Sequence, residues 1–488
     1  VIAPVASGKA ILFFGGILLT AFFLILSAFK KGNIKIPKSA LLISCGAVVL
    51  VWLASALLSG SANLALAGKL YDLDTFSMFF AASLALFFGS IIFQTGKRAF
   101  VFYSLLFLSA FAVFLFQLFH LFFGINIIPF NIFPSNTSNL IGGWNDFSIF
   151  FGFIGLLSLV FLETANFKKG IKFFLYAILF MSFLAMMAAN FFNNWVVFGI
   201  FSLLMFITSL YKKYFAGQAR DFKIKSFLRV SLFALIAVVF FVLANGMTSK
   251  INSALDISFT EVRPSWSATL DIAKKSLKNN AVLGTGPNTF VYDWLKFKPM
   301  AVNSTVFWNA RFSSGFGYLI SMVATTGILG IASIIFFLAI FLNYGRKAIF
   351  SKKNNDGLGD GQGSETLVIA SFFGAAYLWT FVVLYTPGIL VFTMAFVVTG
   401  IFLALLAKDG KIGIAEMFIS RKTKPGMIFM IVAIILLIGA VYSTYLHFQK
   451  FLALNNYSQA LVLFDKSGDV GKTSEKLMKA AKMDKQDE

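Results

Sequence analysis

Cysteine and histidine are scarce in this sequence, and each shortage excludes a class of site. The single cysteine, Cys45, lies inside an apolar run, so no internal disulfide and no thiolate metal site can form. The two histidines, His120 and His447, are far apart in the sequence, which argues against a histidine metal cluster. We therefore predict no metal site and no cofactor.

Charged residues are also few, which excludes a water-soluble chain. They make up 12% of the sequence, against about 25% in soluble domains, and the mean hydropathy is +0.85. The apolar residues fall in runs near 20 long, enough for a helix to cross about 30 Å of hydrocarbon. A helix also satisfies its own backbone hydrogen bonds inside the bilayer. The sequence therefore predicts an all-α, polytopic membrane protein.

We predict about twelve membrane spans, near residues 10–29, 39–58, 77–95, 99–123, 146–166, 171–190, 193–210, 226–244, 316–344, 366–386, 388–407 and 427–446. The chain begins at Val1 and not at Met, and we expect one further span upstream. The spans form a transmembrane domain over residues 1–446, and residues 447–488 form a helical tail.

Positive charge is sorted between the loops, which predicts the orientation. Six loops, every second one, carry 24 Lys and Arg with their adjoining span ends, whereas the four short loops between them carry 1. Basic short loops stay in the cytoplasm, so the net charge of +21 reflects topology and not nucleic-acid binding. This places the long loop of residues 245–315 and the tail outside, in a multi-pass protein of the cytoplasmic (inner) membrane.

Polar residues gather at the predicted outer ends of the spans. GGWNDF (142–147) opens the fifth span and NFFNNW (190–195) forms an outer turn, so Asn145 and Asn194 are candidate substrate-binding residues. The spans hold almost no ionisable residue at mid-depth, which disfavours an ion-coupled transporter.

The sequence of the long loop predicts short helices that lie at the membrane interface. The first begins at Pro264–Ser265 and ends at Asn279–Asn280. Its apolar stripe is expected to lie flat on the bilayer and consists of Trp266, Leu270, Ala273 and Leu277. The Gly-rich turn at Gly284–Pro287 follows, and its amides can form an anion-binding nest.

Arg263 and Arg311 are the arginines that fall outside the cytoplasmic loops, one at each end of the long loop. Arginine binds phosphate through a planar, bidentate fork that lysine lacks. Together with Lys296 and Lys298 they suit a lipid pyrophosphate head group; contact with anionic lipids is the alternative.

Several residues of this loop resemble the O-antigen ligase and polymerase superfamily, which includes O-linked protein oligosaccharyltransferases. The resemblance is carried by Arg263 and Trp266, Ala273, Gly284–Pro287, Phe290, Tyr318–Leu319 and Thr326–Gly330. GGWNDF is similar to a family segment that opens an earlier span. The resemblance implies transfer of a glycan from an undecaprenyl-type lipid pyrophosphate to a hydroxyl of an acceptor lipid, glycan or protein.

The resemblance gives Arg263 the role of stabilising the leaving pyrophosphate, and Arg311 is a candidate second cation. Trp266 is a candidate for substrate binding. Family members usually have a histidine before the Tyr-Leu pair, where this chain has Ser314–Phe316, so Glu261 or Asp293 is a candidate general base.

Two other functions stay open: a flippase or exporter of a lipid-linked glycan, and a non-catalytic membrane scaffold that presents the tail. The tail has a helix, a Gly-Asp turn and a second helix, and resembles the start of a tetratricopeptide array. Such an array suggests a protein partner.

Overall fold

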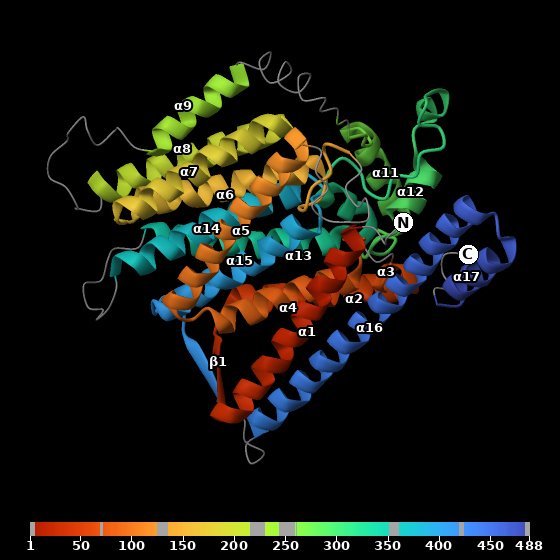
Figure 1. Ribbon diagram of the computed structural model, residues 1–488. Helices are drawn as coiled ribbons and strands as arrows, with labels where there is room; N and C mark the ends of the chain where they lie inside the picture. The colour runs from red at the N-terminus through yellow and green to blue at the C-terminus, as the bar shows by residue number, and fades with distance from the viewer. Residues whose placement is uncertain are drawn as a thin grey trace.

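The computed structural model describes residues 5–68, 72–123, 135–214, 230–243, 259, 261–350, 361–418 and 424–483. Each predicted span corresponds to a helix (Figure 1). These helices are α1 (Val5–Lys31), α2 (Ala40–Leu57), α4 (Phe76–Ile92), α5 (Gly96–Phe123), α6 (Trp144–Thr164), α7 (Lys169–Ala189), α8 (Phe192–Tyr214), α9 (Val230–Leu243), α13 (Tyr318–Phe350), α14 (Gly361–Leu384), α15 (Ile389–Lys408) and α16 (Lys424–Ser467). The shorter elements are α3 (Ala62–Leu66), α11 (Trp266–Asn279), α12 (Phe290–Phe297), η2 (Met300–Ser304) and α17 (Val470–Met483).

Within the residues that the structure describes, 10 helices are long and apolar enough to cross a membrane. The two other predicted spans, α4 with 17 residues and α9 with 14, are apolar but shorter. The prediction of an all-α, polytopic membrane protein is confirmed. The predicted basic loop of residues 211–225 lies mostly outside the described residues, as does the first part of the long loop.

One short β ribbon was not predicted. Strands β1 (Asn33–Pro37) and β2 (Ile414–Phe418) pair antiparallel, with Lys35 opposite Glu416. The Lys35 ammonium and the Glu416 carboxylate lie 2.8 Å apart. The ribbon joins the α1–α2 connection to the α15–α16 connection, so two loops that are distant in sequence meet at one end of the bundle.

The two ends of the bundle differ in what they carry. Figure 1 shows α11, α12, the start of α1 and the α17 end of the chain at one end, and β1 at the other. Basic loops meet at the ribbon end, where Gln94 donates to the Lys35 carbonyl (2.9 Å) and Lys411 to the Ala348 carbonyl (3.5 Å). The described parts of the long loop and of these basic loops therefore lie at opposite ends of the bundle.

The core of the bundle is formed by α6, α14 and α15, with apolar side chains on all sides. In α6, every residue from Phe147 to Phe161 is buried. The outer helices instead expose large apolar side chains, for example Leu12 on α1 and Ile435 on α16. In water such a surface would be costly, whereas lipid tails solvate it.

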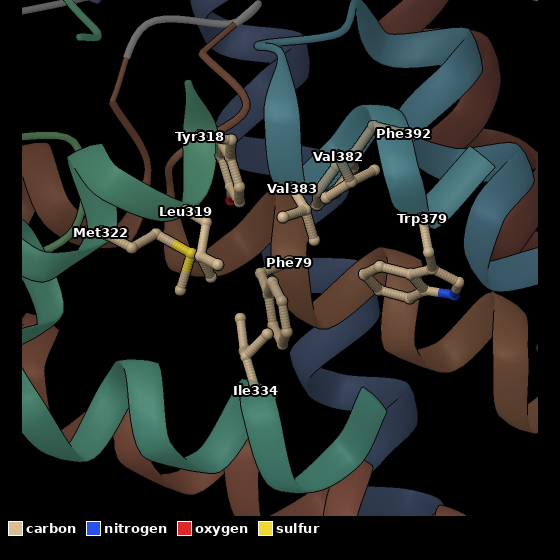
Figure 2. Close-up of a pocket in the computed structure, with 9 residues that line it drawn as sticks. All are labelled: Phe79, Tyr318, Leu319, Met322, Ile334, Trp379, Val382, Val383 and Phe392. Carbon is tan, nitrogen blue, oxygen red and sulfur yellow. The ribbon is translucent and has the colours of Figure 1, made fainter. Parts of the chain in front are cut away.

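A small void lies inside this core. Its volume is about 10 Å³, and Figure 2 shows that apolar and aromatic side chains surround it. The lining comes from α4, α13, α14 and α15 and consists of Phe79, Tyr318, Leu319, Met322, Ile334, Trp379, Val382, Val383 and Phe392. It holds at most one water-sized molecule, so it is a packing defect and not a substrate site.

The Gly-rich turn of the long loop docks into a break in α13. At Gly327 the backbone of α13 is not helical (φ 66°), and the hydrogen bonds lost there are replaced from the loop. Ile328 donates to the Ala281 carbonyl (2.9 Å) and Leu329 to the Val282 carbonyl (3.1 Å).

The prediction of an anion-binding nest at this turn is wrong. The Thr285 amide donates to the Ala324 carbonyl (3.2 Å), and the Gly286 amide donates to the Thr325 carbonyl (2.8 Å). The Gly284 amide is also paired, with the Asn280 carbonyl (3.1 Å). Because these donors already have backbone partners, the turn fastens the loop to α13 and has no amides to offer an anion.

Helix α11 has the predicted bounds but buries a different face. It begins after Ser265, whose hydroxyl accepts a hydrogen bond from the Ala268 amide (3.2 Å), and ends at Asn279. The buried residues are Ala268, Thr269, Ile272, Ala273 and Ser276. This mostly small face packs against α12 and α13, and Trp266 is 51% exposed. Of the predicted stripe only Ala273 is buried in this packing, and contact of the other three residues with the bilayer stays a prediction.

The tail forms the predicted helix, turn and helix. The turn lies at Gly468 (φ 62°) and Asp469, and α17 packs back on α16. However, α16 continues without a break through the predicted domain border at residue 446. Just beyond it, His447 is buried against the Phe14 ring, with ring centroids 3.9 Å apart.

Candidate functional site

Arg263 lies directly before α11, and its guanidinium is held on three sides. It forms an ion pair with Glu261 and hydrogen bonds with the Thr386 hydroxyl and carbonyl, the latter at 3.3 Å. The guanidinium carbon also stacks 3.8 Å from the centroid of the Tyr385 ring. Arg263 is thus fixed against the turn that joins α14 to α15.

That turn is itself fixed by a buried carboxylate on α6. Asp146, in the first turn of α6, accepts hydrogen bonds from the amides of Gly388 (2.8 Å) and Gly143 (3.1 Å). A Cβ on Gly388 would lie 2.7 Å from the Asp146 carboxylate, so the close approach requires glycine. Asp146 therefore joins the start of α6 to the start of α15. In this way it fixes the turn against which Arg263 is held.

Glu261 connects Arg263 to two further side chains. One carboxylate oxygen pairs with Arg263, and the other accepts from the Asn145 amide and the Tyr385 hydroxyl, both at 2.7 Å. Burial, with the nearby Asp146 charge, raises the pKa of Tyr385 well above its ordinary value. The phenol therefore stays protonated and donates to Glu261.

These residues border a cavity of about 400 Å³ between the long loop and the bundle. The lining is mixed: polar side chains stand beside aromatic and aliphatic ones. It consists of Asn145, Ala189, Asn190, Phe191, Asn193, Phe259, Glu261, Arg263, Pro264, Ser265, Phe316, Leu384 and Tyr385. Amides, a hydroxyl and an ion pair can bind a polar head, while the rings and Leu384 can contact apolar groups.

The structure brings Arg263, Glu261 and Asn145 together at this cavity, and separates Asn194 from it. Asn194 is fully buried and donates to the Ser148 carbonyl (2.7 Å). The preceding residue, Asn193, lines the cavity instead, because consecutive residues of a helix point about 100° apart.

The remaining predicted site residues do not line the cavity. Arg311 is exposed, the Lys296 ammonium lies 5.1 Å from the Phe297 ring centroid, and Lys298 donates to the Trp308 carbonyl. Trp266 lies near the rim, with its ring 5.5 Å from that of Phe316.

Asp293, the second candidate base, lies in the packing between α12 and the Gly-rich turn. It is 4% exposed and accepts a hydrogen bond from the Thr285 hydroxyl (2.7 Å). Burial raises the pKa of its carboxyl to about 6. Its contacts fasten α12 to the turn and leave Glu261 as the carboxylate at the cavity.

Three residues of the site were not assigned from the sequence: Asp146, Tyr385 and Thr386. Asp146 stands in the GGWNDF segment, but nothing there shows that its partner is 242 residues away. Tyr385 and Thr386 belong to a short uncharged turn, whose only signal is the Pro387–Gly388 pair.

Among the residues that the structure describes, no three His, Cys, Asp or Glu side chains lie close enough together to bind a metal ion. A comparison with models of known protein families finds no match, and a comparison with curated proteins also finds none.

Proposed function

We propose that this protein is a membrane glycosyltransferase of the O-antigen ligase type, which acts on the outer face of the cytoplasmic membrane. It moves a glycan from an undecaprenyl-type lipid pyrophosphate to an acceptor hydroxyl. One observation carries the proposal: Arg263, the arginine that the resemblance assigns to the leaving group, borders a mixed polar and apolar cavity beside a carboxylate.

The size and lining of the cavity support a lipid-linked saccharide as ligand. Ligand pockets commonly have volumes of about 300–1,000 Å³, and this one has about 400 Å³. The Asn145, Asn190 and Asn193 amides suit sugar hydroxyls, and aromatic faces such as Phe316 suit the apolar faces of sugar rings. The cavity adjoins a bundle whose outer helices contact lipid, so a long prenyl tail can stay in the bilayer.

In this reaction the acceptor oxygen attacks the anomeric carbon, and the bond from that carbon to the pyrophosphate breaks. Negative charge grows on the leaving pyrophosphate, and the Arg263 guanidinium stabilises it. Thr386 and Tyr385 hold that guanidinium in place before the reaction begins. Glu261 is the carboxylate at the cavity that can take the acceptor proton.

The test is reconstitution. The purified protein is placed in liposomes with a radiolabelled oligosaccharide on undecaprenyl pyrophosphate and is offered lipid, glycan and protein acceptors separately. We expect a labelled acceptor and free undecaprenyl pyrophosphate in equal amounts with one of these acceptor classes. An intact donor with all three classes would overturn the proposal.

A further inference from the structure

The anion-binding face of Arg263 is already occupied by a carboxylate of the protein itself. Glu261, two residues earlier, forms an ion pair with Arg263. Carboxylate and phosphate oxygens are both anionic acceptors for a guanidinium, and here one Glu261 oxygen pairs with one Arg263 nitrogen. The residue best suited to a donor pyrophosphate is therefore blocked by an internal anion.

We propose that the donor pyrophosphate displaces Glu261 from Arg263, and that this exchange turns Glu261 into the proton acceptor of the reaction. The inference rests on the proposed function and adds a regulatory step to it. The base is inactive until the donor is bound, because until then its charge is used by Arg263.

The contacts of Glu261 show why it stays in the site after the exchange. Its second oxygen is bound by the Asn145 amide and the Tyr385 hydroxyl, both at 2.7 Å and both neutral. These two contacts do not depend on Arg263, so they hold the carboxylate at the cavity. The exchange frees the carboxylate oxygen that Arg263 now holds, and that oxygen can then take the acceptor proton.

The contacts of Arg263 show why the exchange favours the donor. Thr386 and the Tyr385 ring hold the guanidinium in place independently of Glu261, so it keeps its position when the anion changes. A pyrophosphate diester carries two negative charges against one on the carboxylate. The Glu261 side chain is 29% exposed and its second oxygen keeps two hydrogen bonds, so its charge is not left buried and unpaired when the contact with Arg263 is lost.

The acceptor O–H loses its proton to the Glu261 carboxylate while the acceptor oxygen forms a bond to the anomeric carbon. The bond between that carbon and the pyrophosphate oxygen breaks, and the electron pair leaves with the lipid pyrophosphate on Arg263. When the lipid pyrophosphate departs, Glu261 releases its proton to water and pairs with Arg263 again.

The test separates binding from transfer. Glu261→Gln keeps the size and an acceptor oxygen of the side chain but removes its charge. We expect it to bind undecaprenyl pyrophosphate in mixed micelles about two- to fivefold more tightly than the wild type, since an ion pair that competes for Arg263 is lost. We expect transfer to fall about a hundredfold or more, because the proton acceptor is gone.

Three variants serve as controls. Asp271→Asn removes the same charge from an exposed position on α11, away from the cavity, and should leave both binding and transfer unchanged. Glu261→Ala should also bind more tightly, which guards against a specific effect of glutamine. Glu261→Asp keeps the charge and should retain part of the transfer activity.

The outcomes distinguish this inference from the proposed function. If Glu261→Gln and Glu261→Ala bind the lipid pyrophosphate as weakly as the wild type, or more weakly, the exchange is wrong while a transferring wild type still supports the proposed function. If neither the wild type nor the variants bind it, both proposals fall. If Glu261→Gln binds more tightly and still transfers at the wild-type rate, Glu261 is a competitor for Arg263 but not the base.

Discussion

The amide of Gly388 donates a 2.8 Å hydrogen bond to the carboxylate of Asp146. The two residues are 242 positions apart, and their contact joins the turn before α15 to the start of α6. The same turn supplies Tyr385 and Thr386 to Arg263, and the start of α6 supplies Asn145 to Glu261. The geometry of the site therefore depends on a carboxylate that does not line the cavity.

Replacing Asp146 should loosen this arrangement. Asp146→Ala removes two hydrogen bonds to a charged group, each worth about 1.5–3 kcal/mol, and should lower both the melting temperature in detergent and the transfer rate. Asp146→Asn should cost less, because one amide oxygen can still accept from Gly388. Asp271→Ala on α11 is the control, and an unchanged melting temperature for Asp146→Ala would contradict the structural role.

Arg263→Ala should nearly abolish glycan transfer while the protein remains inserted. Loss of one preorganised charge contact in the transition state costs about 10²–10³ in rate. Arg263→Lys should recover only part of the activity, since the ammonium keeps the charge without the fork. Lys274→Ala, on the exposed face of α11, should transfer normally. Wild-type transfer by Arg263→Ala would exclude the leaving-group role.

Alanine at Gly284 or Gly327 should undo the docking of the loop on α13. Both glycines have a φ of 66°, and a Cβ on either would lie 2.5 Å from a backbone atom of the opposing segment. We expect a loss of stability of about 1–3 kcal/mol from overpacking, in addition to the strain at positive φ, measured by thermal unfolding in detergent. Gly46→Ala, which meets no atom within 4 Å, is the matched control.

The buried carboxyl of Asp293 should make the stability of the folded protein depend on pH. Burial raises the pKa of its carboxyl from 3.8 to about 6 in the folded protein, so between about pH 4 and 6 the folded state binds the extra proton. Its contribution to stability is therefore greatest at low pH and is lost as the pH rises through 6. Asp293→Asn should flatten the melting profile over this window, and an unchanged slope would contradict the assignment.

Cysteine labelling can test which end of the bundle faces outside. Ser304→Cys in η2 and Lys472→Cys in α17 should react with a membrane-impermeant maleimide in intact cells. Lys31→Cys, at the end with the β ribbon, should react only after the membrane is permeabilised. The native Cys45 is buried and should not react with the maleimide. The reverse labelling pattern would overturn the orientation.

The sequence predicted the helices well because a span in lipid is determined by local apolar length. Each predicted span starts within five residues of the start of a helix, including the short α4 and α9, but α16 runs 21 residues past the predicted end at residue 446. The β ribbon was missed because its two five-residue strands pair across about 380 positions, and neither is recognisable without the other. The face of α11 that packs on protein was not predicted, because it uses Ala268, Thr269 and Ser276, whose small size matters only once α13 is known to lie against them.

For the site, the sequence identified Arg263, Glu261 and Asn145 but not the residues that hold them. The charge and chemical type of each residue can be read from the sequence alone. Arg263 and Glu261 were predicted as site residues on this basis. Which of two neighbouring amides, Asn193 or Asn194, faces the cavity depends on the rotation of α8, which composition does not determine. The role of Asp146 depends on a contact between distant helix starts and has no local signature.

The continuity of α16 has a mechanical consequence. At about 1.5 Å per residue, its 44 residues form a rod of about 66 Å, roughly twice the thickness of the hydrocarbon layer. A helix of this length that crosses the bilayer must extend well beyond it, and its C-terminal half pairs with α17 in a helical hairpin. Near its middle the rod is joined to the bundle, because Lys450 donates to the Gly68 carbonyl, so the position of the hairpin is tied to the residues that follow α3.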